Sequence, residues 1–272
     1  MKNLTIDING TCNERCRFCY QTLDGFILLE EEVMRLVNDS DTDVVEIGGG
    51  EPFLDKRIVG IIRGIRAQDK RVHVSTNATV IPQGLLDLEQ RAKNGTQIQV
   101  SLHASNTVLY EQITGKNLFD DAVRNIRTLK PHFSMLMTSA IYEDNLSDVP
   151  QLVNLAEELG LPLRVNLVFP IGNGRNVNRL TPQQVNQLRG YLLQQKIIKG
   201  DKVDSPLIHA NNCYALSEAY GLERQGICPF DCGKVYVTPK GEKSGCEFYN
   251  PTKLVQLMAG ARKWQEKEQD SR

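Results

Sequence analysis

Three cysteines near the start of the chain have the spacing of a metal-binding loop. Cys12, Cys16 and Cys19 form the pattern C-x₃-C-x₂-C, which is compact enough for one loop to present three thiolates to one metal centre. Thiolates are ligands of zinc and of iron–sulfur clusters. A structural zinc ion needs a fourth tetrahedral ligand, and the nearest later histidine is His73. A cluster held by three cysteines would leave one iron open to a substrate or cofactor.

The other four cysteines, Cys213, Cys228, Cys232 and Cys246, lie in the last part of the chain. A strand-like run from Val235, a Pro-Lys-Gly turn and a return separate the last two of them, so a hairpin would bring Cys232 and Cys246 together. Together the four thiolates are a complete set for a closed [4Fe–4S] cluster. A structural zinc site, which also takes four ligands, is the alternative.

Composition limits the classes of partner. The 272 residues include 32 basic and 33 acidic side chains, for a net charge of -1, and no block of one sign. This balance predicts no nucleic-acid partner and no anionic membrane surface. No apolar run reaches the roughly 18 residues of a membrane span, and no signal peptide opens the chain, so we expect a cytoplasmic protein. An odd total of 7 cysteines also argues against a closed disulfide framework.

Strand-like runs alternate with amphipathic helical stretches through about residue 170, which is typical of βα units and a parallel sheet. Six such units predict an α/β fold, a partial (β/α)₆ barrel of the TIM-like kind. The predicted strands cover residues 4–8, 44–47, 72–75, 98–102, 135–140 and 163–169, and the clearest helices cover 56–68, 119–129 and 149–159.

The distinctive residues follow these strands. Cys12 comes after the first strand, the Gly-Gly-Gly-Glu-Pro run of residues 48–52 after the second, and Asn77 after the third, while Ser101 and His103 close the fourth. Because the carboxyl ends of parallel strands meet at one edge of the sheet, we expect one site there.

The character of the chain changes after Pro170, where a loop-like stretch precedes a predicted helix over residues 182–195 and then the four later cysteines. We therefore predict two domains, a barrel over residues 1–175 and a small cysteine-rich module with a C-terminal helix over residues 176–272.

The pattern C-x₃-C-x-aromatic-C after a first strand, followed by Gly-Gly-Glu-Pro after a second, resembles the radical S-adenosylmethionine (SAM) superfamily. The resemblance implies that the three cysteines bind a [4Fe–4S] cluster and that the amino and carboxylate groups of SAM chelate its open iron. An electron from the cluster would then cleave the sulfonium to give a 5′-deoxyadenosyl radical, which abstracts a hydrogen atom from the substrate.

The same resemblance implies positions that contact SAM. The aromatic residue of the cysteine motif would pack near the adenine, the Gly-Gly-Glu segment would receive the methionine ammonium group, and polar residues after later strands would contact the carboxylate or ribose. His103 stands where an aspartate is common, which leaves the ribose contact least defined. The cofactor-binding residues so implied are Phe18, Gly49, Gly50, Glu51, Asn77, Ser101 and Arg175.

The C-terminal cysteines resemble the shortened auxiliary-cluster module, called twitch, of the SPASM group. This implies a second [4Fe–4S] cluster and an enzyme that modifies a ribosomally made peptide by crosslinking, epimerisation or backbone excision. Such enzymes often carry an N-terminal peptide-recognition domain, whereas this predicted barrel begins almost at Met1, so we expect a separate small leader-binding partner protein. A flavodoxin or ferredoxin would supply the reducing electrons.

Two other functions remain open. Residues 113–119 and the Cys232-x₁₃-Cys246 spacing also resemble the molybdenum-cofactor enzyme that rearranges GTP, although that family has a three-cysteine second site and a Gly-Gly C-terminus. The other alternative is a non-catalytic iron–sulfur electron carrier, against which the Gly-Gly-Glu-Pro segment argues.

Overall fold

A curved, largely parallel sheet organises the computed structural model, which describes residues 3–88, 95–205, 220 and 234–244. The strand order is β7-β6-β5-β4-β3-β2-β1-β8-β9. The strands are β1 (Asn3–Asp7), β2 (Val44–Gly48), β3 (Arg71–Thr76), β4 (Thr96–Ser101), β5 (Ser134–Ile141), β6 (Leu163–Leu167), β7 (Val203–Asp204), β8 (Lys234–Val237) and β9 (Lys243–Ser244).

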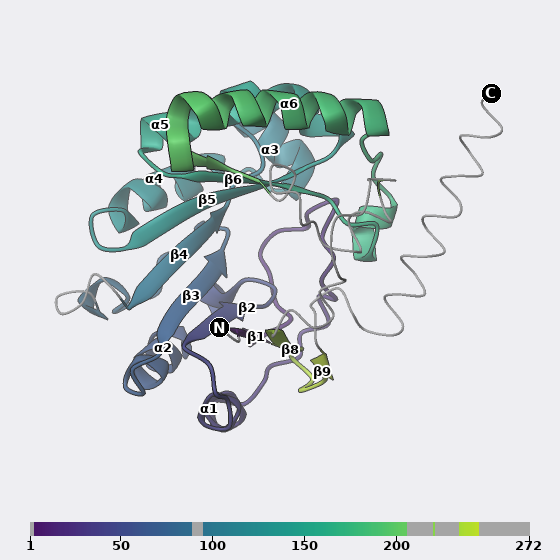
Figure 1. The fold of residues 1–272 in the computed structure, drawn as a ribbon. Helices are drawn as coiled ribbons and strands as arrows, with labels where there is room; N and C mark the ends of the chain where they lie inside the picture. The colour runs from purple at the N-terminus through teal and green to yellow at the C-terminus, as the bar shows by residue number, and fades with distance from the viewer. Residues whose placement is uncertain (1–2, 89–94, 206–219, 221–233, 245–272) are drawn as a thin grey trace.

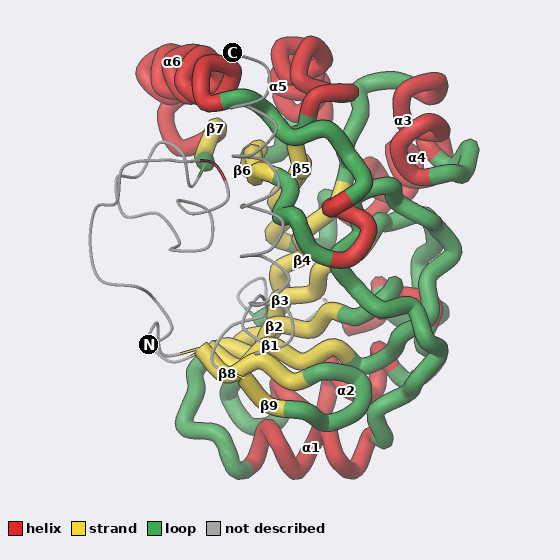
Figure 2. Tube along the Cα trace, turned by 90° about the vertical axis from the view of Figure 1, so that its right-hand side faces the viewer, coloured by secondary structure: helices red, strands yellow, loops and turns green. Residues whose placement is uncertain are grey.

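The helices cover the outer face of this sheet (Figures 1 and 2). They are α1 (Glu30–Asn38), α2 (Ile58–Arg66), α3 (Thr107–Thr114), α4 (Phe119–Leu129), α5 (Val149–Leu159) and α6 (Pro182–Lys199). Strands β1 to β6 follow one another in order and are parallel, which confirms the predicted partial barrel.

The side chains of each strand point alternately to the two faces of the sheet, which separates an apolar layer from a polar interior. Leu4 and Ile6 on β1 are buried in the hydrophobic core, whereas Thr5 and Asp7 line a cavity on the other face. Successive side chains of a strand point to opposite faces, so each strand contributes both to the core and to the cavity. The helices complete the core with apolar faces such as Ile61 and Ile65 of α2.

The predicted helices 119–129 and 149–159 coincide with α4 and α5. Helix α6 extends four residues past the predicted end at 195, because Gly200 is the first residue to leave the helical conformation. Thr181 and Gln184 form a capping box that fixes its start.

Strands β7, β8 and β9 add to the six predicted strands of the barrel. The expected hairpin after residue 235 is confirmed, since Tyr236 pairs with Ser244 in antiparallel register. The sequence did not indicate that β8 also pairs in parallel with β1, from Asn3 opposite Lys234 to Ile6 opposite Val237. Cys213, Cys228, Cys232 and Cys246 lie outside the described residues, so the two-domain division stays a prediction. Among the helices of the described ranges, none combines the length and apolar character needed to cross a membrane.

Candidate functional site

The cysteine loop, residues 9–19, runs across the carboxyl edge of the sheet and is fixed by its own backbone. The amides of Arg15 and Arg17 donate to the carbonyls of Thr114 and Ile113, at 2.8 and 2.9 Å, where α3 ends. At the far end of the loop, the Cys19 carbonyl accepts from the Asn173 amide at 2.8 Å. Helix α3 and the turn after β6 therefore hold the loop from two sides.

The glycines after β2 hold the loop from a third side. The Gly50 amide donates to the Asn9 carbonyl at 2.8 Å, and the Glu51 amide donates to the Thr11 carbonyl at 2.7 Å. A Cβ at Gly49 would lie 2.6 Å from the Asn9 oxygen, and one at Gly50 would lie 2.3 Å from the Thr11 oxygen. The backbone φ of Gly49 is also +141°, a region that favours glycine. Only glycines allow this contact between the two loops.

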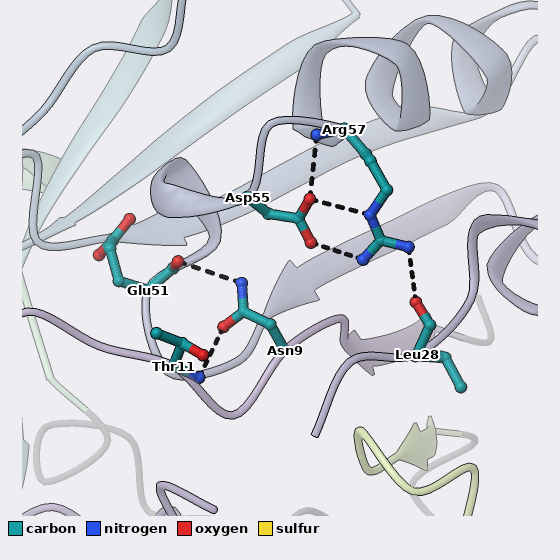
Figure 3. Close-up of polar contacts among 6 residues, drawn as sticks. All are labelled: Asn9, Thr11, Leu28, Glu51, Asp55 and Arg57. Carbon is teal, nitrogen blue, oxygen red and sulfur yellow. Dashed lines mark hydrogen bonds and ion pairs between the residues drawn. The ribbon is translucent and has the colours of Figure 1, made fainter. Parts of the chain in front are cut away.

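Asn9 joins the same two segments through its side chain (Figure 3). Its amide nitrogen donates to the Glu51 carbonyl at 3.2 Å, and its amide oxygen accepts from the Thr11 backbone N–H at 3.2 Å. Nearby, the Arg57 guanidinium binds Asp55 and donates to the Leu28 carbonyl at 2.8 Å, which ties the start of α2 to the chain beyond the cysteines (Figure 3).

The Glu51 carboxylate is buried and accepts three hydrogen bonds. Oε1 accepts from the Phe53 amide at 2.8 Å and from the Thr76 hydroxyl at 2.6 Å, and Oε2 accepts from the Asn77 amide at 2.7 Å. Burial raises the pKa of Glu51 to about 7 even though these donors lower it. The carboxylate thus joins the loops after β2 and β3, and it also lines the cavity.

Asn77 extends this network to the cysteine loop. Its side-chain nitrogen donates to Asn13 at 2.9 Å, and the Asn13 side chain donates in turn to the Thr79 hydroxyl at 2.8 Å. The Thr79 amide donates to the Asn77 side-chain oxygen at 3.0 Å, so these three residues form a closed network of hydrogen bonds. Asn77 therefore orients the loop between the first two cysteines.

The three cysteines are free thiols that line one cavity of about 670 Å³. Burial raises the pKa of Cys12 to about 12 and that of Cys16 well above its ordinary value, and nearby carboxylates add to both shifts. The Cys16 thiol lies 3.5 Å from the Glu14 carboxylate, which also accepts a hydrogen bond from Tyr110. Such thiols stay protonated until a metal stabilises the thiolate.

The donor set fits an iron–sulfur cluster. In the part of the chain that the structure describes, no three Cys, His, Asp or Glu side chains converge on a single metal ion. Three thiols that face one cavity without converging suit a polynuclear cluster, because each thiolate then binds a different iron. Cys12, Cys16 and Cys19 would hold it, and the rest of the cavity leaves room for a ligand beside it.

The inner faces of the strands form the other walls of the cavity. Most of their side chains there are neutral and polar, such as Gln99, Thr138 and Asn166. Among the described lining residues, Arg164 is the one arginine or lysine, and it forms a 3.5 Å ion pair with Asp204. The acidic lining residues are Asp7, Glu14, Glu46, Glu51 and Asp204.

The structure brings together six of the seven residues that the resemblance implies for SAM. Those that line the cavity are Phe18, Gly49, Gly50, Glu51, Asn77 and Ser101. Arg175 is exposed in the turn η4 (Gly172–Arg175) and is not among the lining residues. The contacts of all seven with SAM stay predictions. Sequence reasoning missed the supporting residues Asn9, Asn13 and Tyr110, since no short motif links Tyr110 to the cysteines.

A partial barrel with three cysteines at the carboxyl edge of its strands, facing a polar cavity, defines an iron–sulfur class of barrel protein. Residues 6–156 match the family model described as "Radical SAM superfamily". This match covers more than half of the chain, so the chain belongs to the radical SAM superfamily. Members of this superfamily use a [4Fe–4S] cluster and SAM.

Several known proteins are similar to this chain. It is 27% identical over 190 residues to a "Probable GTP 3′,8-cyclase" of Saccharolobus islandicus, covering 64% of this chain and 59% of that protein. It is 22% identical over 254 residues to the "Antilisterial bacteriocin subtilosin biosynthesis protein AlbA" of Bacillus subtilis, covering 90% of this chain and 54% of that protein. The chain thus spans less than two thirds of the length of either relative.

Among solved structures, SuiB of Streptococcus suis bound to S-adenosylmethionine superposes with a TM-score of 0.73 at 16% identity, covering 91% of this chain and 61% of SuiB. Another SuiB structure, bound to the precursor peptide SuiA, superposes with a TM-score of 0.72. At this identity the likeness confirms the fold, the α/β partial barrel that the sequence predicts.

The first prediction concerns the contact between the glycines and the cysteine loop. Gly50→Ala should lower the iron bound after anaerobic reconstitution, because its Cβ would meet the Thr11 carbonyl at 2.3 Å and displace the loop. We expect a loss of stability of about 1–3 kcal/mol. The matched control is Gly190→Ala in α6, whose Cβ would meet no atom within 4 Å and should stabilise the chain by about 0.5–1 kcal/mol. Iron analysis and urea unfolding would measure both variants. An iron content of Gly50→Ala equal to that of the wild type would contradict the proposed role of this contact.

The second prediction concerns Glu51. Between pH 4.5 and about 7 the unfolded chain has lost the proton that native Glu51 keeps, so the free energy of unfolding falls as the pH rises through this window. Glu51→Gln removes the titrating group. The stability of the metal-free wild-type chain minus that of the variant should therefore decline from pH 4.5 to 7 and level off above it, as measured by urea unfolding. A difference that rises with pH would show that the pKa of Glu51 is not raised.

Proposed function

We propose that this radical SAM protein is an enzyme that abstracts a hydrogen atom from a ribosomally made peptide and thereby starts a crosslink, an epimerisation or a backbone excision. The observation that supports the peptide substrate is the shortage of arginine and lysine side chains among the described lining residues of the cavity. Its described lining residues include five carboxylates and one arginine, and that arginine is in an ion pair with Asp204.

This lining is unsuited to a nucleoside triphosphate. Proteins bind phosphate groups with arginine, lysine and converging backbone amides, whereas carboxylates repel them. A peptide instead presents backbone N–H and C=O groups, which neutral side chains such as Gln99, Thr138 and Asn166 pair with. These three side chains lie on β4, β5 and β6, so they would face an extended substrate along one wall of the cavity.

The names of two similar proteins also support a peptide substrate. SuiB has been captured with its precursor peptide SuiA, and AlbA is named for the biosynthesis of a bacteriocin. The second candidate is the rearrangement of GTP, which the similarity to the GTP 3′,8-cyclase of Saccharolobus islandicus favours. The separate leader-binding partner and the flavodoxin or ferredoxin donor expected from the sequence stay predictions.

The chain's own residues would perform distinct tasks in this reaction. When bound, a [4Fe–4S] cluster and SAM would supply one electron that cleaves the sulfonium C–S bond to methionine and an adenosyl group, and that group would take a hydrogen atom from a substrate carbon. Cys12, Cys16 and Cys19 would hold the cluster at the cavity wall. The glycines and Asn77 keep the loop in place, and the barrel wall excludes bulk water from the reacting carbon.

We also propose that residues 176–272 form the auxiliary module and that Cys213, Cys228, Cys232 and Cys246 hold a second [4Fe–4S] cluster. The number and identity of the ligands support this, since four thiolates complete the coordination of a closed cluster. Such a site has no open iron, so it would transfer electrons to or from the substrate and would not bind SAM.

The third prediction tests both clusters. Anaerobically reconstituted chain should contain about eight irons, and the triple variant Cys12→Ala, Cys16→Ala, Cys19→Ala about four. With dithionite and SAM, the wild type should form 5′-deoxyadenosine and the triple variant should form none, as measured by liquid chromatography. Absence of 5′-deoxyadenosine from the wild type would rule out the proposed activity. About four irons with bound zinc in the wild type would rule out only the second cluster.

The fourth prediction separates the two substrate classes. We expect the reduced enzyme with SAM to leave GTP unchanged and to alter the mass of a short peptide encoded beside its gene, because the described cavity wall offers a triphosphate one arginine, Arg164, which is already paired with Asp204. Mass spectrometry of both incubations provides the readout. Conversion of GTP, with the neighbouring peptides unchanged, would replace the peptide proposal with the second candidate.

A further inference from the structure

Asp7 is the last residue of β1, and its side chain lines the cavity while only 2% of the residue is exposed. Its Oδ2 accepts hydrogen bonds from two side chains that lie far from each other along the chain. The Gln21 side-chain nitrogen donates at 2.5 Å, and the Tyr236 hydroxyl donates to the same oxygen. Asp7 therefore joins the segment that follows the three cysteines to strand β8.

The sheet sets the position of Tyr236. Strand β8 lies beside β1 (Figure 2), with Tyr236 opposite Thr5, and Tyr236 also pairs with Ser244 of β9. Residues two apart on a strand share a face, so the Tyr236 side chain lies on the same face of the sheet as Asp7. Only 3% of Tyr236 is exposed. The C-terminal hairpin of β8 and β9 thus directs this hydroxyl at Asp7.

Gln21 extends the connection to the third cysteine. It lines the cavity two residues after Cys19, and its backbone carbonyl oxygen lies 4.0 Å from the Cys19 sulfur. A continuous series of contacts therefore runs from the Tyr236 hydroxyl through the Asp7 carboxylate and Gln21 to the sulfur of Cys19.

The turn of the hairpin makes a second contact with the same segment. The Lys240 ammonium group lies 3.0 Å from the Asp24 carboxylate and 4.5 Å from the centre of the Phe26 ring. Asp24 in turn packs on the start of the cysteine loop, since a Cβ at Gly10 would lie 2.6 Å from its Oδ1. This ion pair is partly exposed and contributes little by itself. The buried contacts of Asp7 therefore dominate the connection.

Burial makes the hydrogen bonds of Asp7 costly to lose. An ionised carboxylate only accepts hydrogen bonds, and away from water it depends on the donors that the fold supplies. Gln21 and Tyr236 are two such donors, so their positions are linked through one oxygen atom. A ligand site whose supporting hydrogen bonds form in advance does not have to order these groups when the ligand binds.

We infer that Tyr236 and Asp7 are positioning residues for the first cluster, which the three N-terminal cysteines would hold, because they fix Gln21 and thereby the Cys19 end of the cysteine loop. This inference rests on the proposed function. Tyr236 is not among the residues that line the cavity, so it acts through Asp7 and not on a ligand. The hairpin that the sequence places between Cys232 and Cys246 thus becomes part of the support of the barrel's own cofactor site.

The fifth prediction measures SAM binding to anaerobically reconstituted, full-length protein by equilibrium dialysis. Tyr236→Phe should weaken SAM binding about fivefold, because it keeps the ring and removes one donor from a buried carboxylate. Gln21→Met removes the other donor at similar volume and should weaken binding at least as much. The double variant should bind SAM no more weakly than Gln21→Met alone, because both changes act through Asp7. The matched control is Tyr191→Phe in α6, which should leave the affinity unchanged.

Electron paramagnetic resonance of the reduced proteins without SAM is the second readout. After subtraction of the spectrum of the triple cysteine variant, Tyr236→Phe should show altered g values for the first cluster. Unchanged SAM affinity with an unchanged spectrum would overturn the inference, even if the variant were less stable in urea. Single effects that multiply in the double variant would also overturn it. A wild type that binds no SAM would refute the proposed function, whereas altered g values in Tyr236→Phe would still support the positioning role.

Discussion

The backbone contact between the cysteine loop and the glycines after β2 is the constraint on which the rest of the site depends. Gly49 and Gly50 approach Asn9 and Thr11 so closely that no side chain fits between the two segments. This contact sets the height of the cysteines above the sheet. The Glu51 carboxylate accepts a hydrogen bond from the Asn77 amide in the loop after β3, and the Asn77 side chain donates to Asn13 in the cysteine loop. Three loops, those after β1, β2 and β3, are thereby fixed relative to one another before any cofactor binds.

The sheet separates apolar from polar side chains, because successive side chains of a strand point to opposite faces. On each central strand one set of side chains enters the apolar core under the helices, and the alternate set forms the polar wall of the cavity. The inner faces of the strands supply mainly neutral and acidic side chains, whereas the carboxyl edge of the sheet supplies the three thiols and the glycine contact. The fold therefore offers separate surfaces for a substrate and for a cofactor, and this division supports the proposed peptide chemistry.

Much of the barrel could be predicted from the sequence because its signals are local. Apolar residues at helical spacing defined α4 and α5, and the cysteine spacing defined the metal loop. The supporting hydrogen bonds could not be predicted, because their partners lie far apart along the chain. Asn77 and Asn13 are 64 residues apart, Tyr110 and Glu14 are 96 apart, and the bond from Tyr236 to Asp7 spans 229 residues. Nothing in either local sequence specifies the other partner.

The central claim is that the three cysteines hold a cluster with an open iron in the cavity where SAM binds. Electron paramagnetic resonance of the dithionite-reduced, reconstituted protein, recorded before and after addition of SAM, tests it most directly. Direct binding of SAM to an iron changes the electronic environment of that cluster, so the account predicts that SAM shifts the signal of one reduced cluster. A spectrum that saturating SAM leaves unchanged would contradict the account.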